Sequence, residues 1–242
     1  MVKILKVKDE ADKFCKSHFL FDLPFRILLC SKSQLGIGKT TIILGLLLDP
    51  NFKYHDKFDG ENIYIVSNNK LDNKLRLLME YKEIPSANYM KYDEQVLENL
   101  YDELEEEFLL EKEDKKIINR IIIFDDVGYS NSLRDKSAGI VSKLICNGRH
   151  LNISQIYSIQ KMSQASPTLR ANITAALIGS TSMKELQIIS ENYNYLNSNK
   201  QFIKMFRDVT KKPRSFLCVN FTNKDGLYMN SEFQTIDTTQ YE

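Results

Sequence analysis

The chain has 242 residues, of which 43% are hydrophobic and 27% charged, and its formal net charge is +1 at pH 7. This length and composition fit one α/β domain with a full core, and we expect a single domain over residues 1–242. The near-neutral balance excludes an overall electrostatic attraction for nucleic acid, so any such contact must come from local patches.

The cysteines and histidines are scattered along the chain: Cys15, Cys30, Cys146, Cys218, His18, His55 and His150. Their spacing favours reduced thiols over a disulfide set or a zinc site. The chain starts without an apolar signal segment, and no apolar run approaches the ~20 residues of a membrane span. We therefore expect a cytosolic protein with no membrane partner.

Short apolar runs alternate with amphipathic or polar stretches over the first 180 residues. Runs typical of strands occur at residues 2–7, 25–30, 62–67, 120–125, 152–159 and 173–180. Helices are expected before Pro24, at residues 41–48 and 132–147, and within 68–81 and 93–116. This βαβ alternation predicts a mainly parallel sheet flanked by helices, with ligands bound at the carboxyl ends of its strands.

Residues 93–116 are acidic, with Leu97, Leu100 and Leu104 at helical spacing. The carboxylates form either a solvated helix face or an acidic docking surface.

The chain changes character after residue 200. Residues 201–207 and 214–221 are β-type runs, and we expect an antiparallel hairpin extension over about 200–222 beside a core over about 20–180. This extension is basic, through Lys200, Lys204, Arg207, Lys211, Lys212 and Arg214. It is either an exposed hairpin that aids solubility or a surface that follows a DNA backbone.

A phosphate-binding loop is predicted where the run at residues 25–30 leads into the helix at 41–48. Gly38, Lys39 and Thr40 end a G-x-x-x-x-G-K-[ST] motif, in which Ser33 replaces the first glycine. Lys39 is expected to reach the β- and γ-phosphates and the Thr40 hydroxyl to ligate Mg²⁺. The predicted nucleotide-binding residues are Ser33, Gln34, Leu35, Gly36, Ile37, Gly38, Lys39, Thr40 and Thr41.

A second motif follows the run at residues 120–125. Two carboxylates end this run, a Walker B pattern in which Asp125 would hold Mg²⁺ and Asp126 would orient or deprotonate the attacking water. The second position is usually Glu, so the shorter Asp126 is the less secure of the two assignments.

The run at residues 152–159 is bracketed by further polar residues. Gln160 ends it, and an amide there can donate to phosphate and accept from the attacking water. Arg149 precedes the run and Arg170 follows ten residues after Gln160. Each arginine is an arginine-finger candidate, and each also fits a surface ion pair or a DNA-backbone contact.

These three motifs in this order resemble the poxvirus-type genome-packaging ATPases of large DNA viruses and virophages, within the FtsK–HerA superfamily. The most specific part is the Gly-Arg-His run, the strand, Gln160 and the following Leu-Arg-x-Asn. The resemblance implies a ring-forming ATPase, pentameric or hexameric, that uses ATP and Mg²⁺ to drive double-stranded DNA into a capsid. It also implies capsid or portal-vertex partners, and a location in the host cytoplasm, at a viral factory or with the virion.

Two other functions stay open at this point. A small-molecule P-loop kinase shares the loop, although such kinases usually carry an arginine-rich lid. A non-catalytic nucleotide-binding assembly protein would follow if Ser33 and Asp126 were disabling changes.

Overall fold

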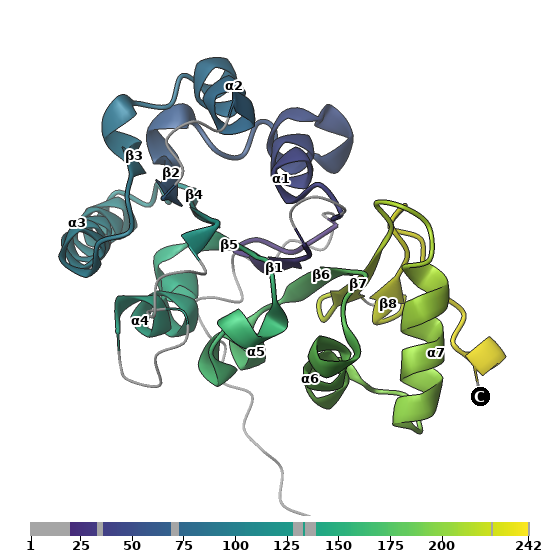
Figure 1. Cartoon of the computed structure of the whole chain (residues 1–242). Coiled ribbons are helices and arrows are strands. Elements are labelled where there is room, and N and C mark those ends of the chain that lie inside the picture. Colours follow the sequence, from purple (N-terminus) through teal and green to yellow (C-terminus); the bar gives the residue numbers. More distant parts are fainter. Residues whose placement is uncertain are drawn as a thin grey trace, which may run out of the picture.

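The computed structural model describes residues 20–32, 36–68, 73–127, 133, 139–223 and 225–241. Within them, eight strands form one sheet in the order β3-β2-β4-β5-β1-β6-β7-β8 (Figure 1). The strands are β1 (Arg26–Cys30), β2 (Ile63–Ser67), β3 (Tyr89–Met90), β4 (Arg120–Asp125), β5 (Ile153–Ile159), β6 (Ala175–Gly179), β7 (Phe216–Asn220) and β8 (Tyr228–Met229). The helices are α1 (Lys39–Leu48), α2 (Asn73–Lys82), α3 (Glu94–Glu113), α4 (Ile140–Asn147), α5 (Pro167–Asn172), α6 (Met183–Tyr193) and α7 (Asn199–Val209).

The first six strands of the chain pair in parallel, and β7 and β8 are antiparallel to their neighbours. The expected mainly parallel α/β sheet is therefore confirmed. β5 lies between β4 and β1, so the strand that ends before Gln160 separates the two strands that carry the predicted phosphate-binding and Walker B motifs.

Helices cover both faces of the sheet (Figure 1). One hydrophobic core lies under α1 and α2, and a second lies under α3 to α7. Alternate residues of β4 enter different cores: Ile121 and Ile123 pack towards α1 and α2, while Ile122 and Phe124 face the other side. Burial on both faces explains why this strand reads as a continuous apolar run.

The expected strand at residues 201–207 is wrong, because this segment lies within helix α7. Phe202, Met205 and Phe206 are buried at the i, i+3 and i+4 spacing of one helix face. The Ser198 hydroxyl accepts from the Gln201 backbone N–H at 3.3 Å and caps the helix start. The antiparallel C-terminal strands are β7 and β8, which pair Cys218 with Met229.

Several expected elements lie partly or wholly outside the described residues. The strand at residues 2–7 is one, and so is most of the helix before Pro24, of which the described residues 20–24 are not helical. Only α4 is seen of the helix expected over residues 132–147. None of the described helices is both long enough and apolar enough to cross a membrane.

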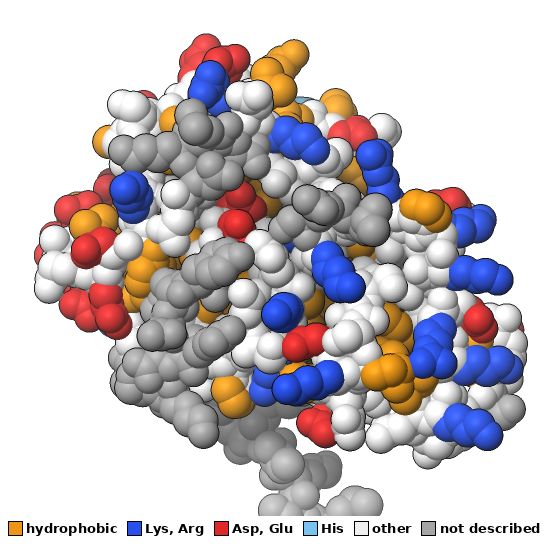
Figure 2. Space-filling model, viewed as in Figure 1, with side chains coloured by type: hydrophobic (Ala, Val, Ile, Leu, Met, Phe, Trp, Pro, Cys, Tyr) orange, Lys and Arg blue, Asp and Glu red, His pale blue; other side chains and the backbone are white. Residues whose placement is uncertain are grey.

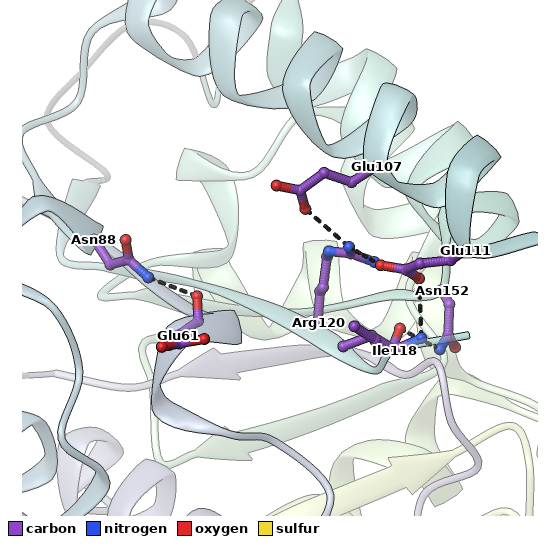
Figure 3. A network of polar contacts seen from close by, with 7 residues as sticks. All are labelled: Glu61, Asn88, Glu107, Glu111, Ile118, Arg120 and Asn152. Atoms are coloured by element: carbon purple, nitrogen blue, oxygen red, sulfur yellow. Dashed lines mark hydrogen bonds and ion pairs between the residues drawn. The ribbon is translucent and has the colours of Figure 1, made fainter. Parts of the chain in front are cut away.

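Helix α3 is tied to the sheet by a buried cation. Arg120, at the start of β4, is 1% exposed and donates to Glu107 at 2.9 Å and to both carboxylate oxygens of Glu111 (Figure 3). Burial lowers the pKa of Arg120, but the hydrogen bonds to Glu111 and Glu107 outweigh it, so the net shift of the pKa is upward. Two of the α3 carboxylates thus hold the helix in place, Glu111 shielded from solvent and Glu107 still exposed on the helix surface.

Candidate nucleotide-binding site

The segment between β1 and α1 turns tightly at two glycines. A Cβ atom on Gly36 would lie 1.9 Å from the Lys32 carbonyl oxygen, so only glycine fits there. Gly38 has φ of 78° in the left-handed region and forms the N-terminal cap of α1. The Ile37 backbone N–H donates to the Ser31 hydroxyl at 3.3 Å. Backbone N–H groups at such a turn into a helix form an anion site.

Ser33, Gln34 and Leu35 lie outside the described residues, so the structure does not place the first half of the predicted loop. Thr40 lies half-buried in the first turn of α1. Thr41 is exposed, and its hydroxyl accepts from Lys74 Nζ of α2 at 2.6 Å.

The Lys39 side chain folds back over the loop. Its Nζ donates to the Ser31 carbonyl oxygen at 2.9 Å. Burial lowers the pKa of Lys39, while the charges of Asp126 and Asp125 act in the opposite direction. The lysine of the loop and the carboxylates at the end of β4 therefore lie within electrostatic range of each other.

A row of polar residues crosses the carboxyl ends of three adjacent strands. Asp125 of β4 is in register with Ser67 of β2 and with Ser158 of β5. Since Ile65, Ile123 and Ile156 pack in the core under α1 and α2, the residues two positions later face the same side. Asp125 is 5% exposed, and the buried Ser158 hydroxyl has no hydrogen-bond partner among the described residues. This face is the one that α1 covers.

Asp126 turns away from the row and meets the predicted sensor. Its φ of 50° is in the left-handed region, which asparagine and aspartate tolerate better than most residues. Gln160 Nε2 donates to Asp126 Oδ1 at 2.9 Å. The structure thus brings together Lys39, Asp125, Asp126 and Gln160, all chosen from sequence.

Two buried residues that the sequence analysis missed support the segment after β5. Gln164 Oε1 accepts from the backbone N–H groups of Gln160 and Lys161, at 2.9 Å each. Glu185 of α6 is 8% exposed and accepts from the Ser163 N–H at 3.0 Å and its hydroxyl at 2.8 Å. Glu185 acts across the fold, since Ser163 lies 22 residues before it in the chain and no local pattern indicates the contact. Gln164 bonds backbone groups only three and four residues before it, and this local capping arrangement after the strand is the signal that could have found it.

The two candidate finger arginines lie elsewhere. Arg170, in α5, donates to the carbonyl oxygens of Ala165 at 3.3 Å and Met162 at 3.5 Å, so it braces its own segment. Arg149 is exposed before β5 and its Nε donates to His150 Nε2 at 3.3 Å. Among the described contacts, neither arginine touches the Asp126–Gln160 pair.

The glycine turn, the lysine, the paired acids and the strand between the two motif strands define the class of fold: a P-loop NTPase. The chain matches the family model described as Poxvirus A32 protein over residues 12–234, and it belongs to that family. A search of curated proteins finds no match.

Solved structures of similar fold include viral packaging enzymes. The genome packaging NTPase B204 from Sulfolobus turreted icosahedral virus 2, in complex with ATP-gammaS, has a TM-score of 0.58 at 18% identity, covering 88% of this chain and 98% of that one. B204, the DNA-packaging ATPase from Sulfolobus turreted icosahedral virus, has a TM-score of 0.55 at 16% identity, covering 89% and 99%. EssC (ATPases 2 and 3) from Geobacillus thermodenitrificans has a TM-score of 0.55 at 16% identity, covering 90% and 42%.

The residues present fit a nucleotide phosphate group with Mg²⁺. The tight turn that only a glycine at position 36 permits, and the left-handed Gly38 before α1, aim backbone N–H groups in the way an anion site requires. The Ser158 hydroxyl, without a partner among the described residues, and the nearby Asp125 supply the oxygen donors that Mg²⁺ and its waters prefer.

Proposed function

We propose that this chain hydrolyses ATP to drive double-stranded DNA into a viral capsid. The observation that carries the proposal is the hydrogen bond from Gln160 to Asp126, which joins the sensor strand to the Walker B acids beside Lys39. A hydrolase needs a group that positions water as well as groups that bind phosphate, and this pair supplies it. Membership of the A32 family and the fold shared with packaging NTPases support a genome-packaging ATPase.

Nucleotide binding is assigned to the loop and the start of α1. Lys39 would exchange its bond to the Ser31 carbonyl for bonds to the β- and γ-phosphate oxygens. These bonds would be stronger, because a charged ammonium group then meets a charged acceptor. Thr40 and Asp125 would hold Mg²⁺ beside the phosphates. Bound there, the ion would neutralise the charge that develops on the phosphate oxygens.

Hydrolysis is assigned to Asp126 and Gln160. The Asp126 carboxylate would accept a hydrogen bond, and then the proton, from the water that attacks the γ-phosphorus. Gln160 would hold the same water with its amide oxygen, while its NH₂ group keeps the bond to Asp126. The bond to Gln160 holds Asp126 in place, so the shorter aspartate can act at a position that is usually occupied by Glu.

The assembly is proposed as a homo-oligomeric ring of five or six copies on a capsid or portal vertex, with the whole chain as one ATPase domain. DNA contact is proposed to be sequence-independent, through the phosphate backbone. The site of action is proposed as the host cytoplasm, at a viral factory or with the virion.

The test is ATP turnover by the purified full chain, with and without duplex DNA of two unrelated sequences. We expect both duplexes to stimulate turnover equally and the stimulation to fall steeply between about 50 and 200 mM salt. Lys39→Ala protein is the control for contaminating ATPases. Phosphate transfer to a nucleoside would instead support a kinase, and an absence of turnover would contradict the enzyme assignment.

A further inference from the structure

We propose that the basic helix at one end of the sheet docks on the acidic helix at the opposite end of a second copy. The basic face consists of Lys200, Lys204 and Arg207 of α7. The acidic face consists of Glu103, Glu106 and Glu113 of α3. The inference rests on the ring of the proposed function and identifies the surfaces that build it.

The basic face is one stripe of the helix. Lys200, Lys204 and Arg207 follow each other at four- and three-residue steps, which places them on the same side of α7. All three are exposed, opposite the buried Phe202 and Met205. The ion pairs found among the described residues involve none of these three cations.

The acidic face is likewise one exposed side of a helix. Glu103, Glu106 and Glu113 are exposed on the side of α3 that points away from the core, and they extend over about 15 Å of helix. They do not include Glu107 and Glu111, which bind Arg120 and fix the helix to β4. Their charge is therefore free of the structural role that part of this helix performs.

The two faces cannot neutralise each other within one copy. α3 lies beside the β3 end of the sheet and α7 beside the β8 end, and in Figure 2 a group of acidic side chains lies at the left, over α3, while a group of Lys and Arg side chains lies at the lower right, near α6 and α7. Four strand intervals separate β4 from β7, about 19 Å, which is more than the Debye length of about 8 Å at physiological salt. A contact between different patches of two copies is heterologous, and it forms a ring when the rotation closes.

Both faces also carry exposed apolar side chains. Leu109 and Leu110 of α3 are 56% and 64% exposed, and Leu110 lies between the acids of the face. On the other side, Met183 of α6 is 54% exposed and accepts from Arg207 Nη2 through its sulfur at 2.8 Å. A DNA backbone presents mainly charged phosphates to a protein, whereas a protein interface combines an apolar centre with a charged rim. This favours a second copy over DNA as the partner of the basic face.

The experiment reverses charge on each face and then on both. Lys200→Glu/Lys204→Glu/Arg207→Glu and Glu103→Lys/Glu106→Lys/Glu113→Lys should each raise the dissociation constant for assembly at least about tenfold, because like charges then face each other. The chain with all six changes should assemble as the unchanged protein does. Assembly is measured as mass in solution by sedimentation velocity, with an ATP analogue present.

A mixture of the two triple variants adds a further condition. Every contact in an alternating mixture pairs opposite charges, so the mixture should associate although neither variant associates alone. The control is Glu61→Lys/Glu80→Lys, two exposed acids that lie in the turn before β2 and in α2, which should leave assembly unchanged. Thermal unfolding of each variant shows whether it has kept its fold.

Three outcomes would overturn the inference. The first is that the variant with all six substitutions stays dissociated. The second is a basic-face variant that assembles normally but loses DNA binding, which would make α7 a DNA surface. The third is an unchanged protein that is monomeric under all conditions. Since the readout is mass, an inactive ATPase would contradict the proposed function without deciding this inference.

Discussion

Gln160 Nε2 donates a hydrogen bond to Asp126 Oδ1 at 2.9 Å across the carboxyl ends of two neighbouring strands. The two residues are 34 positions apart in the sequence, and each follows directly after the last residue of its strand. The bond makes the predicted base and the predicted sensor one unit. We therefore expect their substitutions to act together and not independently.

Loss of this unit should reduce hydrolysis and spare nucleotide binding. Gln160→Ala and Asp126→Asn should each lower kcat by about 10²–10³-fold, because the attacking water is no longer held in line. The double variant should be little worse than Asp126→Asn alone. Steady-state turnover and binding of a fluorescent ATP analogue measure the two effects; multiplicative losses in the double variant would argue against a shared role.

Lys39→Ala should abolish ATP hydrolysis and leave the fold intact, since the side chain contacts a loop carbonyl and not the core. Asp125→Asn should fail through lost Mg²⁺, with nucleotide binding retained and a higher Mg²⁺ concentration needed for any residual turnover. Turnover assays across a Mg²⁺ titration separate the two defects. Unchanged turnover in either variant would contradict the proposal that this chain is an ATPase.

Gln164 is expected to act as a positioning residue for Gln160. Gln164→Leu leaves two backbone N–H groups without their acceptor, which should cost about 1–3 kcal/mol of folding stability and lower kcat. Gln164→Glu replaces the amide oxygen by a carboxylate oxygen that can accept the same two bonds, so this variant should keep most of the turnover. Thermal unfolding together with kcat and KM tests this. If the Leu and Glu variants lose turnover to the same extent, Gln164 contributes only to packing and does not position Gln160.

Gly36 and Gly45 offer a matched pair of alanine substitutions. Gly36→Ala places a Cβ 1.9 Å from the Lys32 carbonyl oxygen, so the loop must open and nucleotide binding should be lost. Gly45→Ala, inside α1, meets Phe52 at an ordinary 3.9 Å and should stabilise the helix by about 0.5–1 kcal/mol. Nucleotide titration and thermal unfolding distinguish the two. Normal ATP affinity in Gly36→Ala would contradict the loop assignment.

We propose Arg170, and not Arg149, as the arginine finger, because Arg170 follows the carboxyl end of β5 while Arg149 precedes the amino end. Removing a true finger should lower turnover by roughly 10³–10⁵-fold with little loss of binding. Mixing inactive Lys39→Ala with inactive Arg170→Ala protein should restore part of the activity, since some interfaces then pair an intact loop with an intact arginine.

The structure adds a control to this experiment. Arg170 also donates to two carbonyl oxygens of its own segment, so Arg170→Ala should lower the unfolding temperature, whereas the exposed Arg149→Ala should not. Recovery in mixtures with Arg149→Ala, and none with Arg170→Ala, would reverse the assignment. If activity recovers in neither mixture, the finger acts on the site of its own subunit or is a different residue.

The sequence by itself determined the elements whose signal is local. The apolar run before Gly38 and Lys39, the run before Asp125 and the run before Gln160 each combine a buried strand with polar residues directly after it. Parallel strands end at one edge of a sheet, so these positions could be brought to one site by pattern alone.

Only the tertiary structure decided the features that depend on contacts between distant segments. The α7 segment was predicted as a strand because it contains a dense apolar run: Phe202, Ile203, Met205 and Phe206. A run this short does not distinguish the two-residue period of a strand from the 3.6-residue period of a helix. Glu185 accepts from Ser163, 22 residues earlier in the chain, and the two come within reach only when α6 packs against the turn that follows β5. A hydrogen bond between residues far apart in the chain has no local pattern, because its geometry exists only after the chain has folded.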